Sequence, residues 1–340
     1  MGIVCNTVLG NFIFIEKRKE AFFVLDRSMT DVLRFISCLL VAGSHYAQYC
    51  ETNNLSDNVV IRLLSTSGGY LGVAFFFFLS GYGLTCSMKN HSYTFGIFIK
   101  RRVKQVYLPA AFISLLWIWA LLLIPHFKCV GAIINHGHLI GNGFSAILGI
   151  LIFRFCDSVL WFVEILLLLN LVFYFYAVLT KVGRNLLSFF VLLVGTTAIM
   201  LYTFFHVGPF AVVSIPLFLI GVLVATYGEW IINNKYKLVL IISLVLFLLA
   251  FVFRRNFVFI HGVINYYLLL MFLFVTSIWN ISFSKIPKII PKMSYDLYLT
   301  HNKLKAIIAA YSPSLSILIF LFLSVLLSLL SCYLRKMIKI

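Results

Sequence analysis

Long, nearly continuous runs of apolar residues recur along the chain, separated by short polar or basic segments. About 20 apolar residues cross a bilayer as an α-helix, whereas a barrel strand alternates apolar and polar residues over about ten positions. The pattern therefore predicts a bundle of about ten transmembrane helices. The expected spans are residues 29–49, 70–88, 105–125, 159–180, 186–206, 209–228, 236–253, 262–281, 294–311 and 315–334.

The pattern also predicts how the chain is divided. Residues 1–28 are expected to be a cytoplasmic leader, because the charged residues at 16–20 interrupt the first apolar stretch. Residues 29–335 form the expected membrane domain, and we expect no soluble C-terminal domain. The run 142–156 is short for a span and is interpreted as a re-entrant or interfacial piece, with an eleventh span as the alternative.

Composition agrees with this fold class. The chain of 340 residues is 62% hydrophobic and 11% charged, whereas soluble domains carry about 25% charged residues. We therefore expect an all-α, polytopic integral membrane protein. The seven cysteines include no C-x-x-C pair, so neither a zinc site nor a disulfide framework is predicted, and no metal is expected.

The net charge of +17 is interpreted as a determinant of membrane topology, and nucleic-acid binding is not expected. With ten spans, one set of loops and both ends of the chain hold nineteen basic residues, and the opposite loops hold seven, including Lys303 and Lys305. The positive-inside rule then places both termini in the cytoplasm, where basic loops also contact anionic membrane lipids. An eleventh span would invert every later loop and remove this asymmetry.

The first span contains three ionisable residues, Asp31, Arg34 and His45. Ionisable residues in hydrocarbon are costly and usually face a partner or a water-filled cavity. Arg34 and His45 are eleven residues apart, which is about three helical turns, so both lie on one face about 16 Å apart. Two simpler interpretations stay open. Asp31 and Arg34 could form an interfacial ion pair, and His45 could bond a neighbouring helix or lie at the outer interface.

Further polar candidates follow in the second and third spans. Ser80 precedes Gly81 in an aromatic run rich in glycine, where helices can approach closely. Arg101 and Arg102 belong to a basic cluster before the third span. Such a cluster is an ordinary topology anchor, but it could also clamp an anionic cofactor, because arginine binds phosphate bidentately.

Later spans add Glu164, Tyr298 and His301. Glu164 is the one acidic residue in the fourth span and could accept a proton, pair with a cation or stay neutral in a helix contact. Tyr298 and His301 are three residues apart and share a helical face.

Four of these segments together resemble the acyltransferase-3 family of membrane O-acyltransferases. The first is Arg34-x10-His45 within LRFISCLLVAGSH, and the second is FFFFLSGYGLT. The third is the basic stretch KRRVKQVYLP, and the fourth is SYDLYLTH. They occur in the family's order over nearly the whole chain. Gln105 departs from the family, which commonly has an arginine four residues before the proline.

The resemblance implies transfer of an acetyl or similar acyl group from cytoplasmic acetyl-CoA to a hydroxyl of a surface polysaccharide or lipid-linked glycan. It makes His45 and Arg34 the expected catalytic pair, with His45 as general base. Arg34, Arg101 and Arg102 are expected to bind the acyl-CoA, and Ser80, Glu164, Tyr298 and His301 are second-tier candidates. The implied location is the bacterial cytoplasmic (inner) membrane.

Three alternatives stay open. A covalent acyl relay could pass through His45 or Ser80 instead of direct transfer. A transporter or lipid-glycan flippase could use Arg34, His45 and Glu164 as a polar path. A membrane glycan polymerase is the third.

Overall fold

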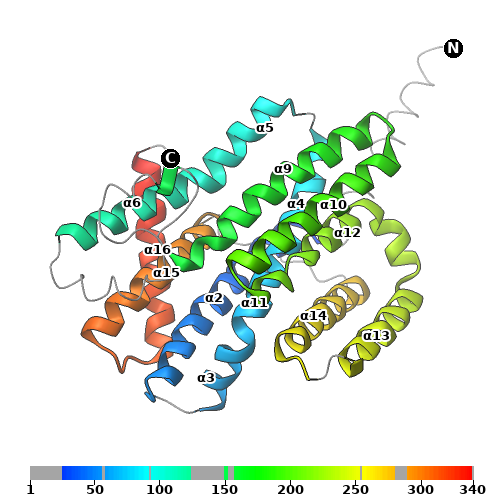
Figure 1. The fold of residues 1–340 in the computed structure, drawn as a ribbon. Coiled ribbons are helices and arrows are strands. Elements are labelled where there is room, and N and C mark those ends of the chain that lie inside the picture. Colours follow the sequence, from blue (N-terminus) through cyan, green and yellow to red (C-terminus); the bar gives the residue numbers. More distant parts are fainter. Residues whose placement is uncertain are drawn as a thin grey trace.

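The computed structural model describes residues 25–55, 58–91, 93–123, 149–151, 157–252, 255–279 and 289–338, and all regular elements in these ranges are helical (Figure 1). The first half contains α2 (Arg27–Thr52), α3 (Val59–Leu63), η1 (Leu64–Gly68), α4 (Gly69–Asn90), α5 (Phe95–Arg102), η2 (Val103–Tyr107), α6 (Leu108–Leu123) and η5 (Ser158–Leu160). The second half contains α9 (Trp161–Lys181), α10 (Asn185–His206), α11 (Pro209–Val212), α12 (Pro216–Asn233), α13 (Lys235–Val252), α14 (Phe257–Trp279), α15 (Ile290–Tyr311) and α16 (Ile317–Met337).

Each of the ten predicted spans overlaps a helix, which confirms the all-α polytopic fold. Within the described ranges, eight helices are long and apolar enough to cross a membrane, and these do not include α2 and α15. Both of those helices have the length to cross, but they are more polar. The predicted piece 142–156 lies largely outside the described residues, as does most of the predicted leader, whose last two residues begin α2.

Two predictions of detail were wrong. The charge count assigned Lys303 and Lys305 to a loop, but both lie within α15, as the predicted span 294–311 requires, and Lys303 is buried there. The third span belongs to a helix that begins at Phe95, so Arg101 and Arg102 are helical. This helix widens into the π-turn η2 just before Pro109. Proline lacks an N–H and its ring clashes with the carbonyl four residues back, and a π-turn relieves that clash.

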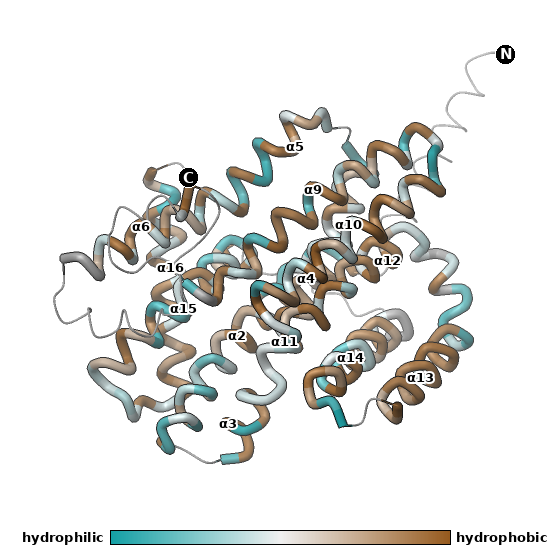
Figure 2. The backbone as a smooth tube through the Cα atoms, viewed as in Figure 1, coloured by the Kyte–Doolittle hydropathy of each residue, from teal (hydrophilic) through white to brown (hydrophobic). Residues whose placement is uncertain are grey.

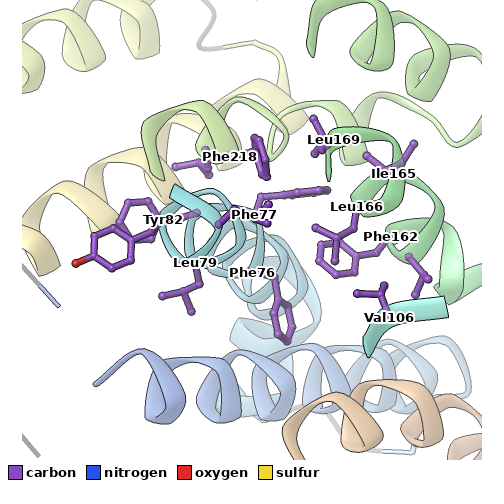
Figure 3. Close-up of a cluster of buried hydrophobic side chains, with 14 of the residues drawn as sticks. Phe76, Phe77, Leu79, Tyr82, Val106, Phe162, Ile165, Leu166, Leu169 and Phe218 are labelled. Atoms are coloured by element: carbon purple, nitrogen blue, oxygen red, sulfur yellow. The ribbon is translucent and has the colours of Figure 1, made fainter. Parts of the chain in front are cut away.

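The centre of the bundle is α4, which packs against α2 and α12 and also touches α9 and α14. Its aromatic run fills the core between these helices (Figure 3), where the Phe77 and Phe162 rings lie 4.8 Å apart. Small residues bring the backbones together. A Cβ atom on Gly81 would lie 2.1 Å from the Phe218 carbonyl oxygen, and one on Gly221 would lie 2.1 Å from the Phe78 carbonyl oxygen.

The helices α13 and α14 form a hairpin beside the bundle (Figure 1), and most of their residues are apolar (Figure 2). Helix α13 packs mainly on α14, and α14 in turn contacts α4. In the most apolar stretch of α13, only 6% of the residues are buried. In the corresponding stretch of the helix that contains α4, the buried share is 56%. Helix α13 is therefore the candidate span with the smallest buried share among the described residues.

Candidate active site

The helices that contain the four sequence motifs meet around α2. Helix α2 packs against α4 on one side and α15 on another. Gly72 makes the first contact close, since a Cβ atom there would lie 2.7 Å from the Ser37 carbonyl oxygen. The Cys38 thiol lies 2.7 Å from the Ser294 carbonyl oxygen, which joins α2 to α15. The Tyr295 hydroxyl donates to the Val106 carbonyl oxygen at 2.8 Å, which adds η2.

His45 and His301 form a stacked pair between α2 and α15. Their ring centroids lie 5.4 Å apart with an interplanar angle of 23°. His45 is half-buried, whereas His301 is fully buried. Nδ1 of His301 lies 2.6 Å from the Tyr298 carbonyl oxygen. Because a carbonyl oxygen can only accept, Nδ1 donates and Nε2 holds the lone pair of the neutral ring.

The Nε2 atom of His301 is buried and has no hydrogen-bond partner among the described residues. Buried polar atoms in folded proteins nearly always have a partner, so an unpartnered one needs an explanation. A basic ring nitrogen next to a second imidazole provides an acceptor for a hydroxyl group. The pair can therefore bind a hydroxyl and take up its proton.

Asp157 holds the segment of α15 that contains His301. Its carboxylate accepts from the Asn302 side-chain amide at 2.7 Å and forms a buried ion pair with Lys303. It also accepts from the Val159 N–H at 3.1 Å, and the Val159 carbonyl oxygen accepts from the Tyr298 hydroxyl. Burial raises the pKa of Asp157, but the Lys303 ammonium and these hydrogen bonds outweigh that effect and hold the pKa below its usual value. A charged Asp157 thus fixes the backbone on either side of His301.

A cationic region lies near the other end of α2. Arg34 bonds Asp31 at 3.4 Å, and a Cβ atom on Gly83 would lie 3.1 Å from its guanidinium, so the SGYG segment leaves room for this side chain. Arg102 lies within electrostatic reach of Arg34. Its guanidinium stands 5.6 Å from the Phe98 ring centroid, and its buried Nε has no partner among the described residues. Two neighbouring guanidiniums with spare donors form an anion-binding arrangement.

The family model described as an acyltransferase domain, Acyl_transf_3, matches residues 30–336. The chain belongs to the acyltransferase-3 family. The match includes all four motifs and extends from α2 to α16, so the protein is an acyltransferase of this family with an integral membrane fold. Searches of curated proteins and of solved structures gave no significant match.

Not all of the residues predicted in this acyltransferase lie at the histidine pair. The structure brings Tyr298 there, since its ring centroid lies 5.7 Å from that of His301. Ser80 is half-buried, and its hydroxyl donates to the Phe76 carbonyl oxygen of its own helix at 2.7 Å. Glu164 is half-buried in the first turn of α9. Arg101 is exposed and donates to the Tyr93 hydroxyl at 2.5 Å.

The sequence reasoning missed Asp157 and treated Lys303 as a loop residue. The signal that could have found them is the run THNKLK, in which two lysines interrupt an otherwise apolar helix and require a buried counter-charge. The described residues contain no group of three or more His, Cys, Asp or Glu side chains that could hold a metal ion.

Proposed function

We propose that this acyltransferase moves an acetyl or similar acyl group from cytoplasmic acetyl-CoA to a hydroxyl of an extracytoplasmic or lipid-linked glycan. The observation that supports this most is the stacked pair of His45 and His301, with the Nε2 lone pair of His301 unpartnered in the described part of the chain. This pair and the cationic region around Arg34 lie toward opposite halves of α2.

The donor binds at the cationic region. Arg34 and Arg102 face its phosphates, and Arg101 is close enough to Arg102 to add a further charge at the surface. From Arg34 to His45 the helix rises about 16 Å. The pantetheine arm of a coenzyme A thioester is long and unbranched, so it can follow this face of α2 into the bundle. The thioester then reaches the histidine pair while the nucleotide stays near the membrane surface.

The transfer needs one base. His45 removes the proton from the acceptor hydroxyl, whose oxygen attacks the thioester carbonyl carbon. The carbon–sulfur bond breaks, and the coenzyme A thiolate leaves and takes up the proton that His45 removed from the hydroxyl, which returns His45 to its neutral form. Imidazole suits this step because its unperturbed pKa is near neutrality. His301 keeps the His45 ring in place by stacking, and its Nε2 accepts from a further hydroxyl of the sugar.

The setting proposed for this reaction is a bacterial cytoplasmic membrane with both termini in the cytoplasm. The bias of nineteen basic residues to seven supports that orientation. It places the loop before α5, and therefore Arg101 and Arg102, on the side where acetyl-CoA is made. Lys303 belongs to α15 rather than to an outer loop, which strengthens the bias.

The test is transfer of radiolabelled acetyl groups from acetyl-CoA to surface polysaccharide in membranes containing each variant. In His45→Ala and in Arg34→Ala, acetylation should fall at least about 100-fold. For His45→Ala this is the usual contribution of a general base. His206→Ala is the matched control, because His206 is exposed and its ring bonds its own helix. Full activity in both His45→Ala and Arg34→Ala would overturn the mechanism. If the glycan were not acetylated even with the wild-type protein, and the variants failed to export the glycan, a transporter would be favoured instead.

A further inference from the structure

A large apolar groove lies between α12, α13 and α14, away from the histidine pair and the cationic region. Its volume is about 810 Å³, within the range of about 300–1,000 Å³ typical of small-molecule sites. Each helix contributes one stripe of side chains at helical spacing; on α13 these are Leu238, Val239, Ile242 and Leu246. Side chains on the opposite side of α13, such as Leu240, are exposed instead. The three stripes therefore face one another across a shared space.

The ends of the groove differ in polarity. Lys235 is the one charged side chain among the described residues that line it, and it lies at the start of α13. Trp230 and Tyr227 line the same end from α12 and are both 58% exposed. Aromatic residues and lysines are typical of the membrane–water interface. The polar end of the groove therefore lies at the head-group level, and the apolar end lies in the hydrocarbon.

The length of the groove matches one leaflet. From Lys235 to Leu246 the lining residues of α13 cover a rise of about 16 Å, roughly half of the 30 Å hydrocarbon core. An apolar path of this length with a cation at its outer end complements a single acyl chain whose anionic head group meets the lysine.

We propose that the groove between α12, α13 and α14 is a binding site for an anionic glycerophospholipid of the leaflet that contacts Lys235. One acyl chain fills the groove, and the phosphate pairs with the Lys235 ammonium. The predicted topology makes this the cytoplasmic leaflet. The lipid fills the space that separates α13 from α12, so it joins the hairpin to the bundle. This site is independent of the proposed acetyl transfer and needs no acetyl-CoA.

Native mass spectrometry of the full chain tests the proposal, after purification in micelles containing equal amounts of phosphatidylglycerol and phosphatidylcholine. The wild type should retain one phosphatidylglycerol per chain. Val239→Trp fills the groove and should abolish retention, whereas Leu240→Trp, one position along the same helix, should not. Circular dichroism and monomer mass confirm that each variant is folded and unaltered in assembly.

A second pair of variants tests the head group without filling the groove. Lys235→Gln should reduce phosphatidylglycerol retention about fivefold and bring it to the level of phosphatidylcholine. Lys237→Gln, two residues further along α13 and not lining the groove, should leave retention unchanged. The proposal would be overturned if the wild type retained no lipid or retained lipid without head-group preference. It would also be overturned if Val239→Trp and Leu240→Trp retained lipid equally. A second copy of the chain or a lipid-linked sugar found in place of the phospholipid would overturn it too.

Discussion

The pair of helices α2 and α15 and the hairpin of α13 and α14 use opposite rules of packing. Helices α2 and α15 are the most polar long helices, yet they lie against each other inside the bundle, and His301 and Asp296 are fully buried. Helix α13 is almost entirely apolar, yet Leu240 is 73% exposed. In a bilayer an apolar side chain gains little by moving from lipid to protein interior, whereas a polar one must find a partner. Polarity therefore keeps α2 and α15 inside the bundle, whereas the apolar α4 lies at its centre because glycines allow close contact with α2 and α12.

Ion pairs hold α15 in that central place at two levels. Asp296 pairs with Arg335 of α16 and also accepts from the Ser331 hydroxyl at 2.7 Å. Two turns later Lys303 pairs with Asp157, which precedes α9. Nothing comparable among the described residues joins α13 to its neighbours. The comparison leads to four predictions: two concern α15 and its ion pair, one concerns the contact of α4 with α12, and one compares the hairpin with α15.

The largest effect is expected from His301→Ala. Loss of the stacked ring lets His45 move out of position, so on the proposed mechanism acetyl transfer should fall by about 10²-fold, as for a misplaced catalytic group. The KM for acetyl-CoA should stay unchanged, because the donor phosphates bind at the other end of α2. Steady-state kinetics on purified protein checks both values. His301→Gln, which keeps a side-chain acceptor, should restore part of the rate. A raised KM for acetyl-CoA with an unchanged kcat would contradict this role.

The next effect is one of stability. Asp157→Ala leaves the Lys303 ammonium buried without its partner, which should lower the free energy of unfolding by about 3–5 kcal/mol. The double variant Asp157→Asn, Lys303→Met removes both charges and should regain most of that loss. Thermal unfolding in detergent compares the three proteins. If the single and double variants were equally unstable, the ion pair would not be what fixes α15.

The sequence predicted most of the fold but only part of the site. Each predicted span overlaps a helix, and the structure gives eight of these helices the length and apolar character to cross a membrane, because hydrophobic length is a local property. The spacing of Arg34 and His45 also followed from helix geometry alone. The pairing of His45 with His301 is different: only the resemblance to the family placed both in one site, since their contact depends on how α2 and α15 pack. The lysines of THNKLK signal that a buried counter-charge is needed, but nothing in the sequence names Asp157 as that partner, because 146 positions separate it from Lys303.

Close packing of α4 on α12 should be sensitive to a single methyl group. In Gly221→Ala the added Cβ would meet the Phe78 carbonyl oxygen at 2.1 Å, so the two helices must separate. The expected loss is about 1–3 kcal/mol, as for other overpacked cores. Gly96→Ala is the control, since a Cβ atom there meets nothing within 4 Å. Denaturation in detergent should show a lower free energy of unfolding for Gly221→Ala than for Gly96→Ala. Equal stability would show that α4 and α12 can move apart at this contact without cost.

The smallest effect is expected on the hairpin. Leu240→Ala removes a side chain that faces lipid, so lipid tails replace the lost contacts and the free energy of unfolding should change by no more than about 0.5 kcal/mol. Leu297→Ala is the counterpart on α15, where the side chain is fully buried. There the lost atoms leave a cavity that no lipid can fill, and the cost should be about 2 kcal/mol, the low end for buried leucines. Unfolding of both variants in the same lipid–detergent mixture makes the comparison direct. Equal costs would mean that α13 is covered by protein in the membrane, and the contrast between the two pairs of helices would then fail.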